Sequence, residues 1–152
     1  MFQRPVHRLV ADLRAGQCSA RELLDHYVNR IARLNGMINA FVYLDPTAVA
    51  AADESDSRLK AGRARSPLEG IPVSIKDNLL VRDCPAVWGS ALYAANVAAH
   101  DELPVARLRM AGAVLLGKTN VPEFALRGYT ANSIRSRLRS SYARQTARGD
   151  FG

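Results

Sequence analysis

Two amphipathic helices are predicted at the start of the chain. A short helix is expected over about residues 6–15, because apolar positions recur there every three or four residues and Gly16 follows. Its apolar positions are Val6, Leu9, Val10 and Leu13. A second helix begins after Ser19, which forms a capping box with Glu22, and is expected to end at Asn35-Gly36. Its apolar face consists of Leu23, Leu24, Tyr27, Val28, Ile31 and Leu34.

A short extended segment and a third helix follow. Residues 40–44 are an apolar run typical of an extended segment. Asp45 as N-cap and Pro46 at the first helical position then predict an alanine-rich helix that reaches about Ala61. Residues 62–66 are polar and are interpreted as a connector. The first part of the chain is therefore predicted to be mainly helical.

The second half of the chain changes to a strand, helix, strand order. Apolar residues alternate over residues 71–75, which predicts a strand buried on one face, and Pro72 restricts it to a short or edge strand. Residues 101–110 are predicted as a helix with Val105 and Leu108 facing inward, and residues 113–116 as a buried strand. This order is typical of α/β architecture, with a parallel crossover between the two strands.

The segments between these elements are polar or weakly patterned. Residues 82–99 are expected to begin as a loop, and residues 121–124 to start another helical turn. Lys118 and Thr119 follow the second strand, and we expect them to form a polar stop with a structural role. Asp77-Asn78 is expected to fix hydrogen bonds of a local turn.

Composition and charge narrow the class of protein. The chain has 152 residues, 48% of them hydrophobic, which is enough for one globular domain with a core. It shows neither a signal peptide nor a membrane-length apolar stretch, so we expect a cytoplasmic protein that does not bind membranes. Residues 134–152 account for +4 of the formal charge of +7, so the rest is nearly balanced. We therefore do not expect nucleic-acid binding by the main body.

The cysteines and histidines suggest no metal site or disulfide framework. Cys18 and Cys84 are far apart, and His7, His26 and His100 share no spacing with each other or with either cysteine. No cofactor is expected.

A set of motifs in a fixed order resembles the amidase signature family. The two most informative stretches are Pro67-Leu-Glu-Gly-Ile-Pro-Val-Ser-Ile-Lys-Asp-Asn78 and Gly117-Lys-Thr-Asn-Val-Pro-Glu-Phe124. The resemblance extends over about residues 6–133. It implies N-terminal helices followed by part of the mixed β-sheet core of an amidase-signature fold, which would be incomplete in this chain.

The resemblance also implies a reaction. Family members hydrolyse carboxylic amide (C–N) bonds of small molecules by a Ser-cisSer-Lys mechanism, without a cofactor, and the lysine aligned with Lys76 is the catalytic base. A lysine can accept a proton only when it is held uncharged by its surroundings. The A subunit of glutaminyl-tRNA amidotransferase belongs to the same family, so a fragment of that protein is an alternative.

The chain departs from the family where the two serines are expected. The glycine- and serine-rich loop is missing, and Ser140-Ser141 has no neighbouring glycine to allow a strained cis peptide. We interpret residues 1–133 as the N-terminal part of an amidase domain and residues 134–152 as an Arg/Ser-rich tail produced by truncation or a frameshift. Arginine makes up 18 of the 21 basic residues, which is typical of a GC-rich gene.

Two consequences are expected from this interpretation. The fragment should be catalytically inactive alone, and it should self-associate through an exposed sheet edge. The alternative from another class is a non-catalytic binding module, in which Ile134, Leu138 and Tyr142 line a basic C-terminal helix that contacts nucleic acid or an anionic surface.

Overall fold

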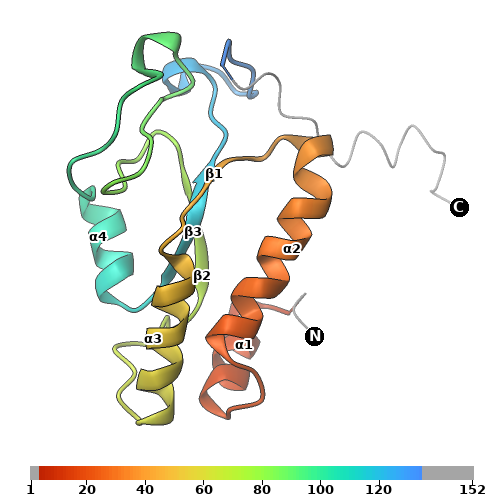
Figure 1. Ribbon diagram of the computed structural model, residues 1–152, viewed down its shortest axis with the longest axis vertical. Coiled ribbons are helices and arrows are strands. Elements are labelled where there is room, and N and C mark those ends of the chain that lie inside the picture. The colour runs from red at the N-terminus through yellow and green to blue at the C-terminus, as the bar shows by residue number, and fades with distance from the viewer. Residues whose placement is uncertain (1–3, 135–152) are drawn as a thin grey trace, which may run out of the picture.

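The computed structural model describes residues 4–134, which form a mixed three-stranded sheet with helices on both faces (Figure 1). The helices are α1 (Val6–Arg14), α2 (Ala20–Ile38), α3 (Ala48–Lys60) and α4 (Leu103–Met110). The strands are β1 (Phe41–Leu44), β2 (Pro72–Lys76) and β3 (Val114–Thr119), and the 3₁₀ turns are η1 (Ala91–Tyr93) and η2 (Glu123–Ala125). The predicted α/β class is confirmed.

The sheet has the strand order β1-β3-β2, so β3 is central and β2 lies at an edge. β2 runs parallel to β3 and α4 forms the connection between them, which confirms the predicted parallel crossover. β1 runs antiparallel to β3 and comes very close to it at Gly117, where a side chain would collide with the carbonyl oxygen of Tyr43. The edge position of β2 agrees with the restriction that Pro72 imposes.

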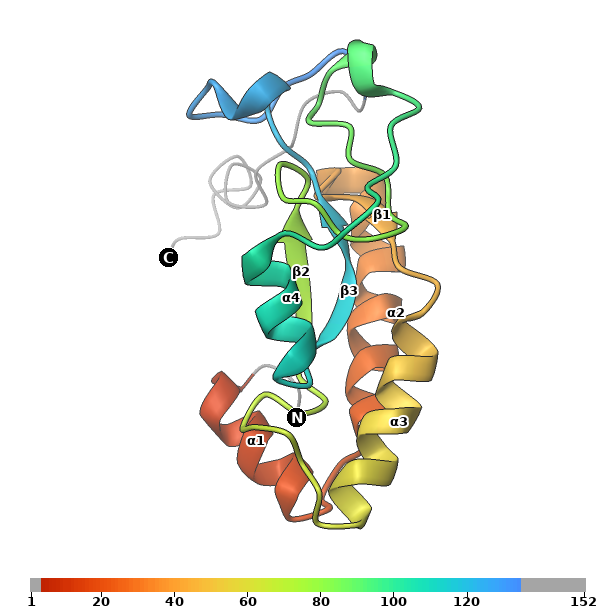
Figure 2. The same ribbon diagram turned by 90° about the vertical axis from the view of Figure 1, so that its left-hand side faces the viewer.

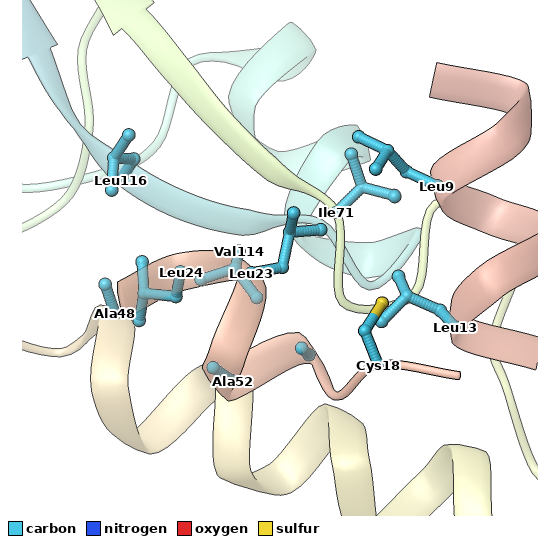
Figure 3. Packing of buried hydrophobic residues seen from close by; sticks show 11 residues of the cluster. Leu9, Leu13, Cys18, Leu23, Leu24, Ala48, Ala52, Ile71, Val114 and Leu116 are labelled. Carbon is cyan, nitrogen blue, oxygen red and sulfur yellow. The ribbon is translucent and has the colours of Figure 1, made fainter. Parts of the chain in front are cut away.

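Each face of the sheet has its own apolar core. Figure 2 shows the sheet between α4 on one side and α2 and α3 on the other. The larger core joins α1, α2 and α3 to β3 (Figure 3) and includes Leu9, Leu13, Leu23, Leu24, Ala52, Ile71, Val114 and Leu116. The smaller core lies under α4 and contains Ile75, Val81, Cys84, Val105 and Leu115, with Leu108 packed against it. Within residues 4–134, no helix has the length and apolar composition needed to cross a membrane.

The start of α2 is confirmed, but its predicted end is wrong. The Ser19 hydroxyl accepts from the Glu22 N–H at 3.0 Å, and the Glu22 carboxylate accepts from the Ser19 N–H at 2.9 Å. The helix continues past Asn35 to Ile38, and Asn39 adopts the left-handed conformation that ends it, with φ of 56°. The Asn35 side chain does not stop the helix because it reaches forward to β1, where it bonds both the N–H and the carbonyl of Phe41.

The predicted start of α3 is two residues too early. The helix begins at Ala48, and its N-cap position is Thr47. The Asp45 carboxylate accepts from the Thr47 N–H at 2.8 Å and from the Thr47 hydroxyl at 2.7 Å, so it closes a turn before the helix. Sequence alone does not separate this turn from a helix cap, because both use an aspartate oxygen in the same way.

Candidate active site at the ends of β2 and β3

Lys76 is the last residue of β2, and its side chain is exposed to solvent. It stands in register with Thr119, the last residue of β3. Its carbonyl accepts from the Leu79 N–H at 3.0 Å, which turns the chain away from the sheet. Within the described residues, the Lys76 ammonium has no hydrogen-bond or ion-pair partner. The candidate base therefore lies at the carboxyl end of a parallel pair of strands, where α/β folds usually bind ligands.

The neighbouring strand carries a second lysine in a very different environment. Lys118 is completely buried, and its ammonium lies 2.9 Å from the Asp77 carboxylate, itself buried. The ammonium also donates to the Pro85 carbonyl at 2.9 Å. Lys118 and Thr119 lie inside β3, so the expectation that they form a polar stop after the strand is wrong. A charged residue fits in this strand because Asp77 compensates its charge.

The expected local turn is present at Asp77-Asn78, but the Asp77 carboxylate bonds the loop that follows. Its carboxylate accepts from the Trp88 N–H at 3.1 Å, while its own N–H donates to the Thr119 carbonyl at 3.0 Å. Next to Trp88, Gly89 has a φ of +66°, and a side chain there would come within 2.7 Å of the Val121 carbonyl oxygen. These contacts hold the Trp88-Gly89 turn against both strand ends.

Two asparagines that sequence reasoning did not single out complete this end of the molecule. The Asn120 side chain donates to the Asn39 carbonyl at 3.1 Å and accepts from the Val121 N–H at 2.9 Å and from the Asn132 side chain at 2.8 Å. Asn132 in turn donates to the Val121 carbonyl at 2.7 Å. Asn120 lies in one of the two informative motifs, which was the available signal.

The cysteines do not contribute a nucleophile to this region. Burial, followed by the nearby charge of Asp45, raises the pKa of the Cys84 thiol to about 11, so it stays protonated near neutral pH. Its sulfur lies 3.9 Å from an Asp45 carboxylate oxygen. Cys18 is buried in the other core, and both thiols are free. In the part of the chain that the structure describes, no group of three or more His, Cys, Asp or Glu side chains is arranged to hold a metal ion.

A groove opens between α2 and the sheet, on the side of β2. It has a volume of about 390 Å³ and is mainly apolar. Its walls include Tyr27, Ile31, Leu34 and Ile38 from α2, and Pro72 and Ser74 from β2. Ser140, Ser141 and the basic tail of residues 135–152 lie outside the described residues.

The sequence of this chain matches a known protein family and its members. A model of the amidase family matches residues 22–149. The chain is 37% identical over 134 residues to the A subunit of the glutamyl-tRNA(Gln) amidotransferase of Acidothermus cellulolyticus, a match that covers 88% of the chain and 26% of that protein. It is 43% identical over 124 residues to the corresponding protein of Prochlorococcus marinus, with 80% and 25% covered.

Solved structures agree with the sequence match. The native peptide amidase from Stenotrophomonas maltophilia superimposes with a TM-score of 0.82 and 34% identity, covering 90% of this chain and 30% of that enzyme. The chain thus spans between a quarter and a third of the length of these relatives. Since the family match includes most of its residues, the chain belongs to the amidase signature family.

Proposed function

We propose that this chain supplies the lysine-bearing part of a site that hydrolyses carboxylic amide bonds by a Ser-cisSer-Lys mechanism. Lys76 acts as the base, and the two serines come from outside residues 4–134. The observation that carries the proposal is the position of Lys76. It ends an edge strand with its ammonium unpartnered in the described structure, next to a turn that Asp77 fixes.

The surroundings of Lys76 explain why a second segment is required. A lysine acts as a base only where its surroundings exclude water and hold its amine uncharged, and the Lys76 side chain is exposed to solvent. A segment that covers the free edge of β2 would exclude water from Lys76 and place a serine hydroxyl within hydrogen-bond distance of it. The buried pair of Lys118 and Asp77 keeps the end of the sheet rigid while that segment binds.

Part of an amidotransferase A subunit is the second candidate. The two relatives at 37% and 43% identity both carry that name, which favours an amide-hydrolysing protein that works in a larger assembly. Both candidates use Lys76 in the same way and differ in substrate. The amidase is expected to hydrolyse the amide of a small molecule. The amidotransferase subunit is expected to hydrolyse the side-chain amide of glutamine.

A chimera with a complete relative tests the role of Lys76. Residues 6–134 replace the matching segment of the Stenotrophomonas maltophilia peptide amidase, and hydrolysis of a peptide amide is measured. The folded chimera should be active, and Lys76→Ala should lower kcat by roughly 10² to 10⁴, the usual contribution of a general base. Lys60→Ala is the matched control, because Lys60 is another exposed lysine, located at the end of α3. A Lys76→Ala chimera as active as the Lys60→Ala chimera would refute the proposal.

The 152-residue chain alone gives a second test. We expect no amide hydrolysis above background and no labelling of Ser140 or Ser141 by a fluorophosphonate. Stoichiometric labelling of either serine that disappears in Lys76→Ala would instead show that the chain contains its own nucleophile.

A further inference from the structure

The chain after β3 leaves the sheet and then returns to it. Residues 121–131 form a loop that contains η2, at the end of the molecule where β2 and β3 finish (Figure 1). Where this loop closes, the Asn132 side chain donates to the side-chain oxygen of Asn120 at 2.8 Å and to the Val121 carbonyl at 2.7 Å. Asn132 is therefore held beside the two residues that come directly after β3.

Asn120 is a firm anchor for this contact. It is buried, with 7% of its surface exposed. Its backbone N–H donates to the Ala40 carbonyl at 2.7 Å, and its side-chain nitrogen donates to the Asn39 carbonyl at 3.1 Å. Its side-chain oxygen accepts from the Val121 N–H at 2.9 Å as well as from Asn132. The position of Asn132 is thus set by the residues before β1 and by the end of β3 together.

Asn132 also lies against the turn that Asp77 holds. A side chain at Gly89 would come within 3.2 Å of the Asn132 side-chain nitrogen, so glycine lets the two segments approach this closely. The residue before it, Trp88, donates its N–H to the Asp77 carboxylate at 3.1 Å. Asp77 directly follows Lys76. A short series of contacts therefore links Asn132 to the end of β2 that carries the proposed base.

The Asn132 side chain sets the direction of the outgoing chain as well. Its oxygen accepts from the N–H of Ile134, the last residue that the structure describes, at 3.2 Å, which closes a tight turn. We propose that Asn132 is a positioning residue, which fixes where the chain after residue 134 begins relative to Lys76. This role rests on the proposed function, in which both serines come from outside residues 4–134, and the family resemblance implies that they follow this point in the sequence.

The reaction is sensitive to this placement. A base must lie about 2.6 to 3.2 Å from the hydroxyl whose proton it accepts, and a displacement of about 1 Å can lower the rate about 10²-fold. The amide of Asn132 matches its neighbours, because its nitrogen meets two acceptors and its oxygen meets an N–H. An aspartate has the same shape and keeps the bond to Ile134, but it has no donor for Asn120 and Val121.

Amide hydrogen exchange followed by NMR tests the contact in the complete 152-residue chain. The Phe124 N–H donates to the Trp88 carbonyl at 2.9 Å from within the loop that Asn132 closes. In Asn132→Asp this N–H should exchange at least about tenfold faster, because the loop opens more often. Asn132→Ala removes the same bonds without adding a charge and should have the same effect. The Val114 N–H, which bonds Ile71 at the start of β3, is the internal reference and should not change.

The chimera with the peptide amidase tests the effect on the reaction. Asn132→Asp and Asn132→Ala should each lower kcat about 10²-fold. KM should stay within about threefold, because the bonds that are lost place reacting groups and do not bind substrate. Fluorophosphonate labelling separates misplacement from partial unfolding. A misplaced serine should be labelled slowly but completely, whereas partial unfolding would lower the labelled fraction and leave the rate unchanged.

Asn96→Asp is the matched control. The Asn96 side chain also donates to a backbone carbonyl, that of Ala86, at 2.9 Å. Both residues belong to the loop of residues 82–99, and their bond does not join the ends of the strands. This variant therefore loses a bond of the same kind, and its kcat should stay within about twofold of the parent chimera.

Two results would overturn the positioning role. Unchanged exchange at Phe124 in both Asn132 variants would show that Asn132 does not hold this end of the chain, and this measurement requires no activity. An unchanged kcat in both Asn132 variants, in a chimera that Lys76→Ala inactivates, would also refute the role of Asn132 while leaving the proposed function intact. Full activity of the Lys76→Ala chimera would instead refute the proposed function itself.

Discussion

The two ends of β2 are both held by a buried acid, but the acids work differently. At the amino end, Glu69 accepts from the Arg65 side chain at 2.7 and 2.9 Å, from the Arg65 N–H at 2.9 Å and from the Ser55 hydroxyl at 2.9 Å. At the carboxyl end, Asp77 pairs with Lys118, a residue of the neighbouring strand. The acid at the amino end pairs with an arginine four residues before it in the sequence. The acid at the carboxyl end pairs with a lysine of β3 that is far away in the sequence.

Under the proposed function, this difference separates a structural end of β2 from the end that carries the proposed base. At the amino end, Arg65 is paired with Glu69. At the carboxyl end two lysines occur, and the acid binds Lys118 and leaves Lys76 exposed. The proposed base is therefore the exposed lysine and not the buried one. The buried lysine pairs with Asp77, whereas the exposed one has no partner within residues 4–134.

The largest effect that tests this comparison is expected from Lys118→Met. Removal of the ammonium leaves the Asp77 carboxylate buried without its counter-ion. The free energy of unfolding should fall by about 3 to 5 kcal/mol, the usual consequence of breaking a buried ion pair. Urea unfolding followed by circular dichroism measures this loss.

A double variant is the control for that result. Lys118→Met with Asp77→Leu removes both charges and should recover most of the lost stability. A loss of less than about 1 kcal/mol in the unfolding free energy of Lys118→Met would mean that the buried Asp77 carboxylate does not need Lys118 as its counter-ion. The two ends of β2 would then not differ as described.

The next largest effect is expected at the other end, from Glu69→Gln. Burial alone would raise the pKa of the Glu69 carboxyl, but hydrogen bonds from Arg65 and Ser55 outweigh it and lower that pKa. The carboxylate therefore stabilises the fold above the unfolded-state value of about 4.3, and this contribution disappears as the pH falls through the lowered pKa. Glu69→Gln should cost about 2 kcal/mol at pH 7.

The pH dependence of this loss tests whether the charge of the Glu69 carboxylate causes it. The difference in unfolding free energy between the two proteins should shrink steadily below about pH 4, because the wild-type carboxylate is then being protonated. A difference that stayed constant down to about pH 2.5, well below the ordinary carboxyl range, would mean that shape, and not charge, holds this end of β2.

Local signals made most of the fold predictable. The capping box at Ser19, the alternation over residues 71–75 and the breaks at Gly16 and Gly112 each act within a few residues, and the structure contains the corresponding elements. The errors occurred where a distant contact decides. Asn35 bonds Phe41 and does not end α2, so no pattern within the helix could locate its last turn.

The candidate site was less predictable for the same reason. Lys76 was identified by resemblance, and its place at a strand end followed from the alternation before it. The pairing of Asp77 with Lys118 was missed because it joins the residue after β2 to a residue of β3, and these strands become neighbours only through the crossover. Long-range charge compensation leaves no periodic pattern in a sequence, and local signals assigned Lys118 to a polar stop and Asp77 to a local turn.

Reactivity of the lysines should show the difference without any substitution. The chain contains only Lys60, Lys76 and Lys118, so amine labelling followed by mass spectrometry can follow each one. Lys60 and Lys76 are exposed and should be acetylated at similar rates, whereas Lys118 should react at least about tenfold more slowly, because its reaction requires local opening. Equal rates at Lys76 and Lys118 would contradict the described environments.

The smallest effect on stability is expected from Lys76→Ala. Its ammonium has no partner within residues 4–134, and the backbone bonds of β2 do not involve its side chain. The free energy of unfolding should therefore change by no more than about 0.5 kcal/mol, as is usual at exposed positions. Urea unfolding alongside Lys118→Met measures both lysines under the same conditions. A near-zero change in stability, together with a large loss of turnover in the chimera, would show that Lys76 contributes to the reaction and not to the stability of the fold.

A loss of about 2 kcal/mol or more in the free energy of unfolding is typical of residues with buried partners. Such a loss would show that Lys76 stabilises the sheet, and that it differs from Lys118 only in the size of its contribution.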